Sequence, residues 1–377
     1  MKKILFAAVA AAVVALPSCS SDETVDLNKG NEVNFSVTAG KSSRAQATTT
    51  ASISEFKTYA VASENDGAFF MNGVEVKKQG DAWAYSPTKF WPNGGTVNFL
   101  SISPCTPQSG TVAASAEAGG SLKLNDYTVA AAADEDLLYA ANYGESKANP
   151  QVKVNFRHAL SQIFFQVANT NSTLNIKVND VKIVNLANKA SLTWATQSTN
   201  DPNYSETENG GQGDGKHETE LTGTWGVWST PEGNTQYTAV GSLVELNGET
   251  QATAYTTDGG LMVMPQAITP WDFTSTEAES CGAYILINCQ VVDETGAQLW
   301  PAKNVEGGFA QVAIPLTAPD GKWMQGKKYI YTLKFGNGAG WTPGTDPEPV
   351  LVPVEFTVTV DEFQTQDPID VDMNQKK

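Results

Sequence analysis

Histidine, cysteine and positive charge are all scarce in this chain, and each shortage excludes a class of function. The 377 residues include two histidines, four cysteines, and 24 basic against 41 acidic side chains, a formal net charge of -17. An acidic protein repels nucleic acid and anionic lipid, so we exclude a nucleic-acid partner. His158 and His217 have no metal-binding spacing, and neither a nucleophile motif nor a glycine-rich phosphate loop accompanies them. We therefore predict no enzyme, no metal site and no cofactor.

The cysteines do not form a disulfide framework. Setting aside Cys19 leaves an odd number, Cys105, Cys281 and Cys289. Cys281 and Cys289 fall in one expected strand, roughly 26 Å apart if it is extended, which is too far for a disulfide between them. We expect these side chains to be small, buried and apolar.

Long apolar runs are also missing, apart from a short one at the N-terminus. Residues 4–16 are apolar but too few to span a bilayer, and they follow the basic start MKK, as in a secretory signal peptide. We predict that residues 1–18 are this signal and are removed. The sequence LPSC at 16–19 resembles a lipoprotein box, so we expect Cys19 to carry lipid such as palmitate. An ordinary signal peptide with a chance cysteine is the alternative. The serine and acidic residues at 20–23 are similar to an export tag for the outer face of the outer membrane.

Strand patterns fill the rest of the chain, and no segment after the signal has a helical period. We expect strands at residues 31–38, 56–62, 83–85, 97–102, 174–186 and 284–292, separated by turns rich in Asn and Gly. The Ala- and Gly-rich residues 111–120 and the polar span 196–220 are expected to be loops. Length and spacing together predict an all-β protein of two β-sandwich domains.

The central stretch, residues 152–167, changes the side on which its apolar residues lie. Positions 152, 154 and 156 share one face of the strand, and positions 163, 165 and 167 share the other. Such a change requires a bulge, a bend or a transfer between sheets near residues 158–161. We interpret it as a strand that leaves one domain and begins the next, with domains at about 45–150 and 151–377.

Several motifs resemble the fimbrillin family, specifically the Mfa-like branch of surface pilins from anaerobic Gram-negative bacteria. They are KFWP at 89–92, DLLYA at 136–140, FRHALSQI at 156–163, LMVMPQ at 261–266 and WMQGKKYIYTL at 323–333. Their order matches the family and they cover most of the mature chain. The resemblance implies transthyretin-like topology and a structural subunit of a cell-surface fimbria, which serves adhesion and polymerises with other fimbrial subunits.

The resemblance also implies a maturation step at the start of the chain. Residues 19–44 would be a lipidated segment whose removable first strand carries Val33, Phe35 and Val37 on one face. Arg44 and Ala45 lie in a polar stretch of small residues, the kind of loop that proteases cut. An arginine-specific protease would cut between them and release the strand.

The donor that replaces this strand would be the C-terminal segment of a neighbouring subunit, near residues 350–371. Six apolar residues fall on one face of a single expected strand there: Val350, Val352, Val354, Phe356, Val358 and Val360. Pro353 on the other face suits an edge strand, and open sheet edges accept such strands from other chains. The resemblance thus implies assembly by donor-strand exchange.

A monomeric, glycan-binding surface lipoprotein is the alternative, because the chain has nine tryptophans and sugar faces stack on aromatic rings. Trp225, Trp228 and Trp271 are the candidates, although packing in the core and in turns is the simpler role for them. We expect the acidic residues 134–136 to be a solvated turn rather than a cation site, and His158 to have a structural role. The alternative accounts for the surface address and the tryptophans, but not for the ordered fimbrillin motifs.

Overall fold

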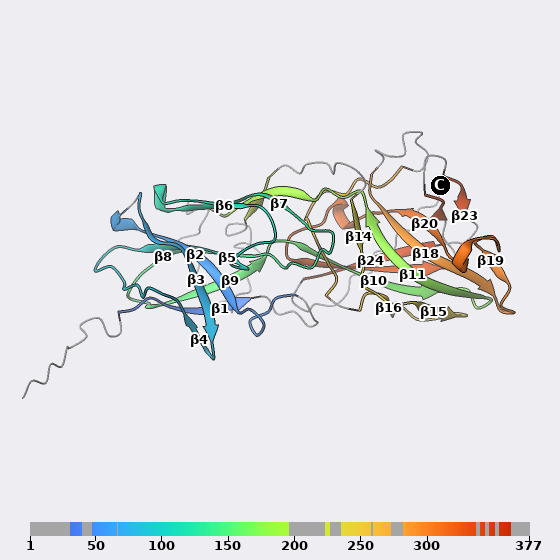
Figure 1. Cartoon of the computed structure of the whole chain (residues 1–377), viewed down its shortest axis with the longest axis horizontal. Coiled ribbons are helices and arrows are strands. Elements are labelled where there is room, and N and C mark those ends of the chain that lie inside the picture. The colour runs from blue at the N-terminus through green and yellow to red at the C-terminus, as the bar shows by residue number, and fades with distance from the viewer. Residues whose placement is uncertain are drawn as a thin grey trace, which may run out of the picture.

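The computed structural model of the protein describes residues 31–39, 47–65, 67–195, 223–226, 235–257, 259–272, 282–336, 340–343, 347–350 and 354–362. These residues form strands and short 3-10 turns, which confirms the expected all-β class. The strands make two groups of sheets that lie end to end along the long axis of the molecule (Figure 1). No helix in this described part of the chain is long and apolar enough to cross a membrane.

The N-terminal group is built on a seven-stranded sheet in which β1 and β9 are parallel and all other neighbours are antiparallel. Its strands in spatial order are β1 (Asn34–Ala39), β9 (Gln151–His158), β8 (Leu138–Glu145), β5 (Val97–Ser103), β2 (Glu55–Ala62), β3 (Phe69–Gln79) and β4 (Ala82–Ala84). The sheet curves so that its edge strands, β1 and β4, approach each other. At its centre both faces are covered, because all seven residues of β5 are buried.

A four-stranded sheet packs on one of these faces. Its strands in order are β13 (Thr224–Trp225), β12 (Lys189–Thr193), β7 (Ser121–Thr128) and β6 (Thr111–Ser115). Leu100 and Ile102 of β5 share a core with Leu124 of β7 and Leu192 of β12. The expectation of a loop at residues 111–120 is wrong for its first half, because β6 pairs with β7 through its backbone and packs Val112 and Ala114 against the core.

The C-terminal group is a β-sandwich of a five-stranded and an eight-stranded sheet. The first contains β16 (Thr253–Ala254), β10 (Ser161–Asn169), β21 (Lys327–Phe335) and β24 (Val354–Glu362) in order, with β17 (Leu261–Val263) also on β10. The second contains β14 (Gln236–Thr238), β11 (Leu174–Val184), β18 (Tyr284–Asp293), β20 (Ala310–Pro315), β22 (Gly340–Trp341) and β23 (Pro349–Val350), with β15 (Val244–Asn247) on β11 and β19 (Gln298–Trp300) on β18. The described residues of the two groups also form short 3-10 turns: η1 (Ser63–Asn65) and η2 (Glu117–Gly119) in the N-terminal group, and η5 (Glu306–Gly308) and η6 (Pro319–Gly321) in the C-terminal group.

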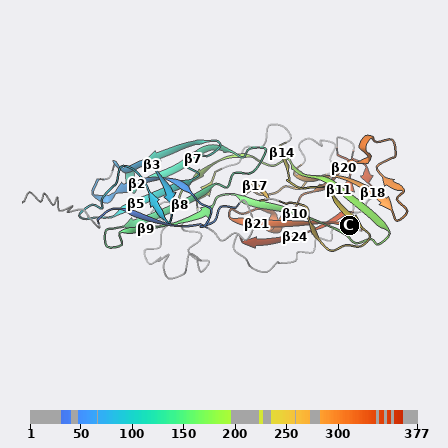
Figure 2. The same ribbon diagram turned by 60° about the horizontal axis from the view of Figure 1, so that its bottom comes forward.

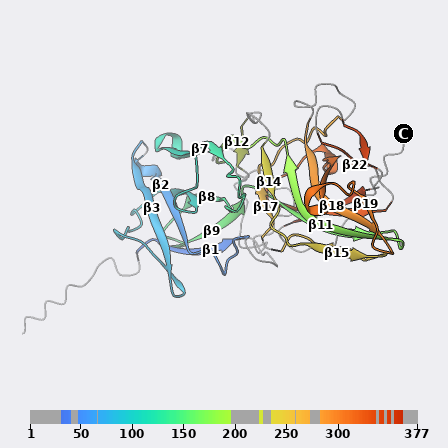
Figure 3. The ribbon, with the colours of Figure 1, turned by 45° about the vertical axis from the view of Figure 1, so that its right-hand side comes forward.

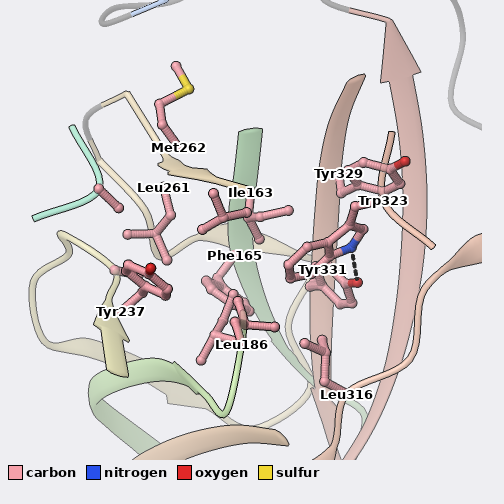
Figure 4. Close-up of a cluster of buried hydrophobic side chains, with 14 of the residues drawn as sticks. Ile163, Phe165, Leu186, Tyr237, Leu261, Met262, Leu316, Trp323, Tyr329 and Tyr331 are labelled. Carbon is pink, nitrogen blue, oxygen red and sulfur yellow. Dashed lines mark hydrogen bonds between the residues drawn. The ribbon is translucent and has the colours of Figure 1, made fainter. Parts of the chain in front are cut away.

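The core of this sandwich is closely packed around buried aromatic side chains (Figure 4). Phe165 of β10 and Tyr331 of β21 pack ring to ring, with centroids 5.8 Å apart. The Trp323 Nε1–H donates to the Tyr331 hydroxyl at 2.9 Å, and that hydroxyl donates to the Thr317 carbonyl at 2.7 Å. A buried aromatic side chain with a polar atom is stable only when that atom finds a partner, and this chain of bonds supplies it.

The backbone passes from one group to the other at residues 159 and 160. β9 ends at His158 in the seven-stranded sheet, and β10 begins at Ser161 in the five-stranded sheet. This confirms the transfer between sheets that the change of apolar face predicts. The division into domains at 45–150 and 151–377 stays a prediction; β9 and β12, which follow residue 150, pair with β8 and β7, which precede it.

Candidate functional site

The first strand, β1, is inserted into the core of the N-terminal group, side by side with β9 (Figure 3). Its residues alternate between burial and exposure, as expected from the sequence. Val33, just before the strand, and Phe35, Val37 and Ala39 within it have exposed fractions of 1%, 4%, 8% and 4%. β1 is parallel to β9 in a register that places Val37 opposite Val154, and both side chains enter the same core.

Phe35 is at the centre of this insertion. Its ring meets those of Phe56, Tyr85 and Phe99 edge to face, with centroid distances of 5.5, 5.6 and 5.8 Å. Edge-to-face aromatic pairs contribute about 0.5 to 1.5 kcal/mol each beyond their burial. β1 is therefore packed as part of the core and not as a loose edge.

Hydrogen bonds from outside the sheet clamp the start of β1. The Val33 N–H donates to the Lys89 carbonyl at 2.9 Å, and the Tyr85 hydroxyl donates to the Val33 carbonyl at 2.8 Å. The Trp91 N–H donates to the Asn31 carbonyl at 2.9 Å. The segment that carries the KFWP motif thus pairs with the chain that enters β1.

A single side chain, Thr50, clamps the end of β1. The Ala39 N–H donates to the Thr50 Oγ1 at 2.9 Å, and the Thr50 hydroxyl donates to the Ala39 carbonyl at 2.8 Å. One hydroxyl therefore satisfies both backbone groups of the last residue of the strand. Thr50 lies beyond Arg44 in sequence, so a cut after Arg44 would separate Ala39 from it covalently.

A residue that follows the expected cut, Thr48, is also hydrogen-bonded to a distant side chain. The Thr48 N–H donates to the Asp136 Oδ2 at 2.5 Å, and the other oxygen, Oδ1, is 2.9 Å from the His158 Nδ1. The side chains of His158 and Asp136 are 4% and 3% exposed. The expectation of a solvated acidic turn is therefore wrong for Asp136, whereas His158 has the structural surroundings expected for it.

Glu135, which precedes Asp136 in sequence, is hydrogen-bonded as well. It accepts hydrogen bonds from the Gln108 N–H at 2.8 Å and from the Tyr127 hydroxyl at 2.9 Å. Burial raises the pKa of Glu135, and these two hydrogen bonds act against that rise. In the described part of the chain, no group of three or more His, Cys, Asp or Glu side chains could hold a metal ion.

The expected donor segment is divided between two strands and is not a single strand. Val350 lies in β23, which pairs with β22, whereas β24 starts at Val354 and pairs with β21 in the other sheet of the sandwich. β24 is the edge strand of its sheet and lies beside β21 (Figure 2). Val358 is completely buried there, while Phe356 and Val360 are partly buried.

The remaining expected site residues divide into two sets. Cys19, Arg44, Ala45, Val352 and Trp228 lie outside the described residues. Trp271 is 4% exposed and packs on Tyr284, and the partly buried Trp225 donates from Nε1 to the Ala159 carbonyl at 2.8 Å. These two rings serve packing, and neither is an open platform for a sugar.

Two clamp residues, Tyr85 and Thr50, are functional candidates that sequence reasoning did not find. Tyr85 lies 52 positions from the carbonyl that it binds, and Thr50 lies 11 positions from Ala39 across the expected cut. No local pattern marks a hydroxyl that binds a distant backbone. The expected strand at 83–85 and the motif KFWP at 89–92 were signals near Tyr85, and neither pointed to this role.

Comparison with known proteins identifies the family. The fimbrillin-like family model matches residues 41–361. No curated protein matches the chain. A fimbrial protein from Bacteroides vulgatus has a similar structure, with 16% identity, a TM-score of 0.49, and coverage of 88% of this chain and 99% of that one. The tip fimbrial protein Mfa3 from Porphyromonas gingivalis, with a C-terminal truncation, has 10% identity and a TM-score of 0.30, with coverage of 87% of this chain and 99% of that one.

Because the family model spans most of its length, the chain belongs to the fimbrillin-like family and is a structural subunit of cell-surface fimbriae, not an enzyme.

Proposed function

We propose that this subunit matures by proteolysis after Arg44 and polymerises by donor-strand exchange, so that fimbriae built from it serve adhesion. The observation that carries the proposal is the insertion of β1. Its side chains Val33, Phe35 and Val37 are core residues of the N-terminal group, yet a single cut at residue 44 would detach it from the rest of the chain. A core that depends on a removable strand suits exchange with another strand.

Removal of β1 would leave a groove that a second strand must fill. β9 would lose the backbone partner on its outer edge, and the rings of Phe56 and Phe99 would lose their contact with Phe35. Burying a Val or Phe side chain is worth about 1.5 to 3 kcal/mol, so three of them offer on the order of 5 to 9 kcal/mol to an incoming strand. An unpaired edge beside an apolar groove favours strand addition.

The cut would also switch the groove from a state that tethered β1 fills to a state that a donor strand can enter. While β1 is tethered, its effective concentration at the groove far exceeds that of any neighbour, so the groove stays filled. After the cut, β1 is held by non-covalent contacts alone. A donor that is part of another subunit can then compete for its place.

Cleavage by an arginine-specific protease would be selective in this chain. Arg44 and Arg157 are its two arginines. Arg157 lies within β9 and is paired with Tyr139 of β8, so its backbone is engaged in the sheet. Because proteases bind unpaired, extended chain, the native protein should be cut at Arg44 and spared at Arg157.

Lipid on Cys19 would anchor the uncut protein in the outer membrane, facing outward. The support is the lipoprotein box at residues 16–19 and the serine and acidic residues after it. Stable anchoring requires more than one acyl chain, which acylation of a lipoprotein cysteine supplies. Cys19→Ala protein should not incorporate a fatty-acid probe; incorporation equal to that of wild type would refute the anchor.

The proteolytic switch is tested by comparing two variants of the same stretch. Arg44→Ala removes the expected cut, and Lys41→Ala removes a nearby positive charge but leaves the arginine. After treatment with an arginine-specific protease, electron microscopy should show fibres for wild type and Lys41→Ala and none for Arg44→Ala. Fibres of Arg44→Ala in equal amount would contradict the proposal.

A further inference from the structure

One face of β2 and β3 carries a row of side chains that strand exchange does not use. The two strands are neighbours in the N-terminal group (Figure 1), and Tyr59 of β2 pairs with Leu100 of β5. Paired residues point to the same side of a sheet, and Leu100 packs toward the four-stranded sheet. The row therefore lies on the side opposite the core that holds β1. We call it the β2–β3 strip; it consists of Glu55, Lys57, Tyr59, Phe69, Glu75 and Lys77.

The ring of Tyr59 lies flat on the backbone of β3. A Cβ atom at Gly73 would be 3.2 Å from the Tyr59 hydroxyl oxygen and 3.3 Å from both its Cε1 and its Cζ. A point at nearly equal distances from three neighbouring atoms of a planar group lies above that plane and not at its edge. One face of the ring therefore rests on Gly73, where a side chain would be crowded, and the opposite face is turned away from the sheet.

Phe69 stands beside this ring as a wall. The two ring centroids are 6.1 Å apart and the ring planes are inclined by 60°. Both side chains are partly exposed. Within the described part of the chain, the Tyr59 hydroxyl has no hydrogen-bond partner. The two rings thus form a step of apolar surface with an unused hydroxyl at its edge.

Paired charges continue the strip beyond the rings. The Lys57 Nζ is 3.7 Å from the Glu75 Oε1, and the Lys77 Nζ is 3.3 Å from the Glu75 Oε2 and 3.7 Å from the Glu55 Oε2. These four side chains are between 22% and 55% exposed. Two lysines balance two glutamates, so the strip has no net charge, although the whole chain carries -17.

The turn between β6 and β7 closes one end of the strip. Val61 follows Tyr59 on the same face of β2, and a Cβ atom at Gly120 of the turn would be 3.1 Å from the Val61 Cγ2. The Gly67 N–H, just before β3, donates to the Ala116 carbonyl at 3.1 Å. The aromatic step is therefore backed by a fixed turn, and the charged end of the strip leads away from it.

An uncharged carbohydrate fits this arrangement. A sugar ring has an apolar face of C–H groups that stacks on aromatic rings, and a rim of hydroxyl groups that donate and accept hydrogen bonds. The Lys57 ammonium and the Glu75 carboxylate offer charge-assisted bonds to such hydroxyls. An anionic ligand gains nothing from a neutral strip on an acidic protein, and a purely apolar partner would have to desolvate the charged residues.

We propose that the β2–β3 strip binds an uncharged glycan, with one sugar ring stacked on Tyr59 against Phe69. The next sugar along the glycan hydrogen-bonds to the pair of Lys57 and Glu75. This site names the ligand class for adhesion and rests on the proposed function for that role. Because the strip lies on the other side of the sheet from β1, every subunit of a fibre would display it.

Calorimetric titration of the uncut protein tests the site without fibre assembly. The probes are soluble oligosaccharides of glucose, mannose and galactose, each with α and with β linkages, and a sulfated heparin oligosaccharide. At least one neutral probe should bind, with an affinity that salt leaves nearly unchanged, and the sulfated probe should not. Failure of every neutral probe, or tighter binding of the sulfated one, would overturn the proposal.

Substitutions place the glycan on the strip. Tyr59→Ala and Phe69→Ala should each weaken binding about tenfold, because each removes a stacking surface. Tyr59→Phe keeps the ring and should cost less. Phe164→Ala, which removes a partly exposed ring from β10 in the other group, is the matched control and should bind as wild type does. Full binding by both alanine variants of the strip, or an equal loss in the control, would refute the site.

A charge exchange guards against loss of the fold. Lys57→Glu combined with Glu75→Lys keeps an ion pair between β2 and β3 but exchanges the donor and the acceptor that face the glycan. The thermal midpoint should stay close to that of wild type while binding weakens severalfold. Unchanged binding would refute the role of this pair.

The outcomes for the glycan and for the fibre are separate. Fibres of Tyr59→Ala that form normally and no longer bind the glycan would support both the site and strand exchange. Wild-type protein that forms fibres but binds no neutral probe would refute the site alone. Wild-type protein that binds a neutral probe through Tyr59 but forms no fibres after processing would refute the assembly and leave the site standing.

Discussion

Thr50 is a single hydroxyl that binds both backbone groups of Ala39, and its contribution can be separated from that of packing. Thr50→Val keeps the shape of the side chain and removes both hydrogen bonds. Because each bond contributes about 0.5 to 1.5 kcal/mol, the end of β1 should lose about 1 to 2 kcal/mol of local stability. Exchange of the Ala39 amide hydrogen should become roughly tenfold faster. Thr50→Ser, which keeps the hydroxyl, is the control, and equal exchange in Thr50→Val and wild type would contradict the clamp.

The thiol of Cys289 predicts a dependence of stability on alkaline pH. Burial in β18 raises its pKa to about 12, whereas an exposed thiol has a pKa near 8.5. The unfolded state therefore releases the proton first, and stability is lost as pH rises from about 8.5 toward 12. The urea midpoint of wild type should fall more steeply over this range than that of Cys289→Ala. Parallel falls in the two proteins would show that this thiol ionises equally in the folded and unfolded states.

At the scale of the element, β1 is a core strand, and we propose that a cut after Arg44 makes it removable. Phe35→Ala should lower the stability of the uncut protein by about 3 to 5 kcal/mol, because it removes a buried ring with three ring contacts. It should also let β1 leave the groove faster after the cut, which release of the peptide from processed protein measures.

A control of similar cost lies in the other group. Ile287→Ala, in β18 at the centre of the eight-stranded sheet, should also destabilise the protein but leave the release of β1 unchanged. If the two variants released the peptide at the same rate, the link between Phe35 and the seating of β1 would be wrong.

Local alternation was enough to predict several elements, and distant contacts explain where it failed. β1, β5 and β18 lie where apolar patterns place them, and the change of face within 152–167 correctly predicts the transfer between sheets. The break between β23 and β24 was not predicted, because the apolar residues at 350–360 keep one phase across it. Burial of Asp136 was missed because its partners, Thr48 and His158, lie 88 and 22 positions away.

The maturation site could be predicted from the sequence less fully than the strands. That Val33, Phe35 and Val37 are buried could be predicted from their alternation. Their insertion beside β9, and the clamps at both ends, depend on residues that sequence distance separates from β1. The roles of Arg44 and Cys19 come from resemblance and stay predictions.

At the scale of the whole molecule, we propose that one groove is filled by β1 before the cut and by a donor strand after it. In the uncut protein β1 fills the groove, and β24 remains at the edge of its own sheet. In the fibre, the apolar side chains that fill the groove would come from the next subunit. Because the groove lies in the N-terminal group and the donor in the C-terminal group, exchange would join copies end to end along the long axis of the molecule (Figure 1).

The mass of the subunits inside a fibre tests this account most directly. Washed fibres are dissociated in denaturant, and the intact mass of the released chains is measured. We predict chains that begin at Ala45 and retain residues 354–360. Chains that still contain residues 31–39, or the recovery of the β1 peptide in amounts equal to the subunits, would contradict it.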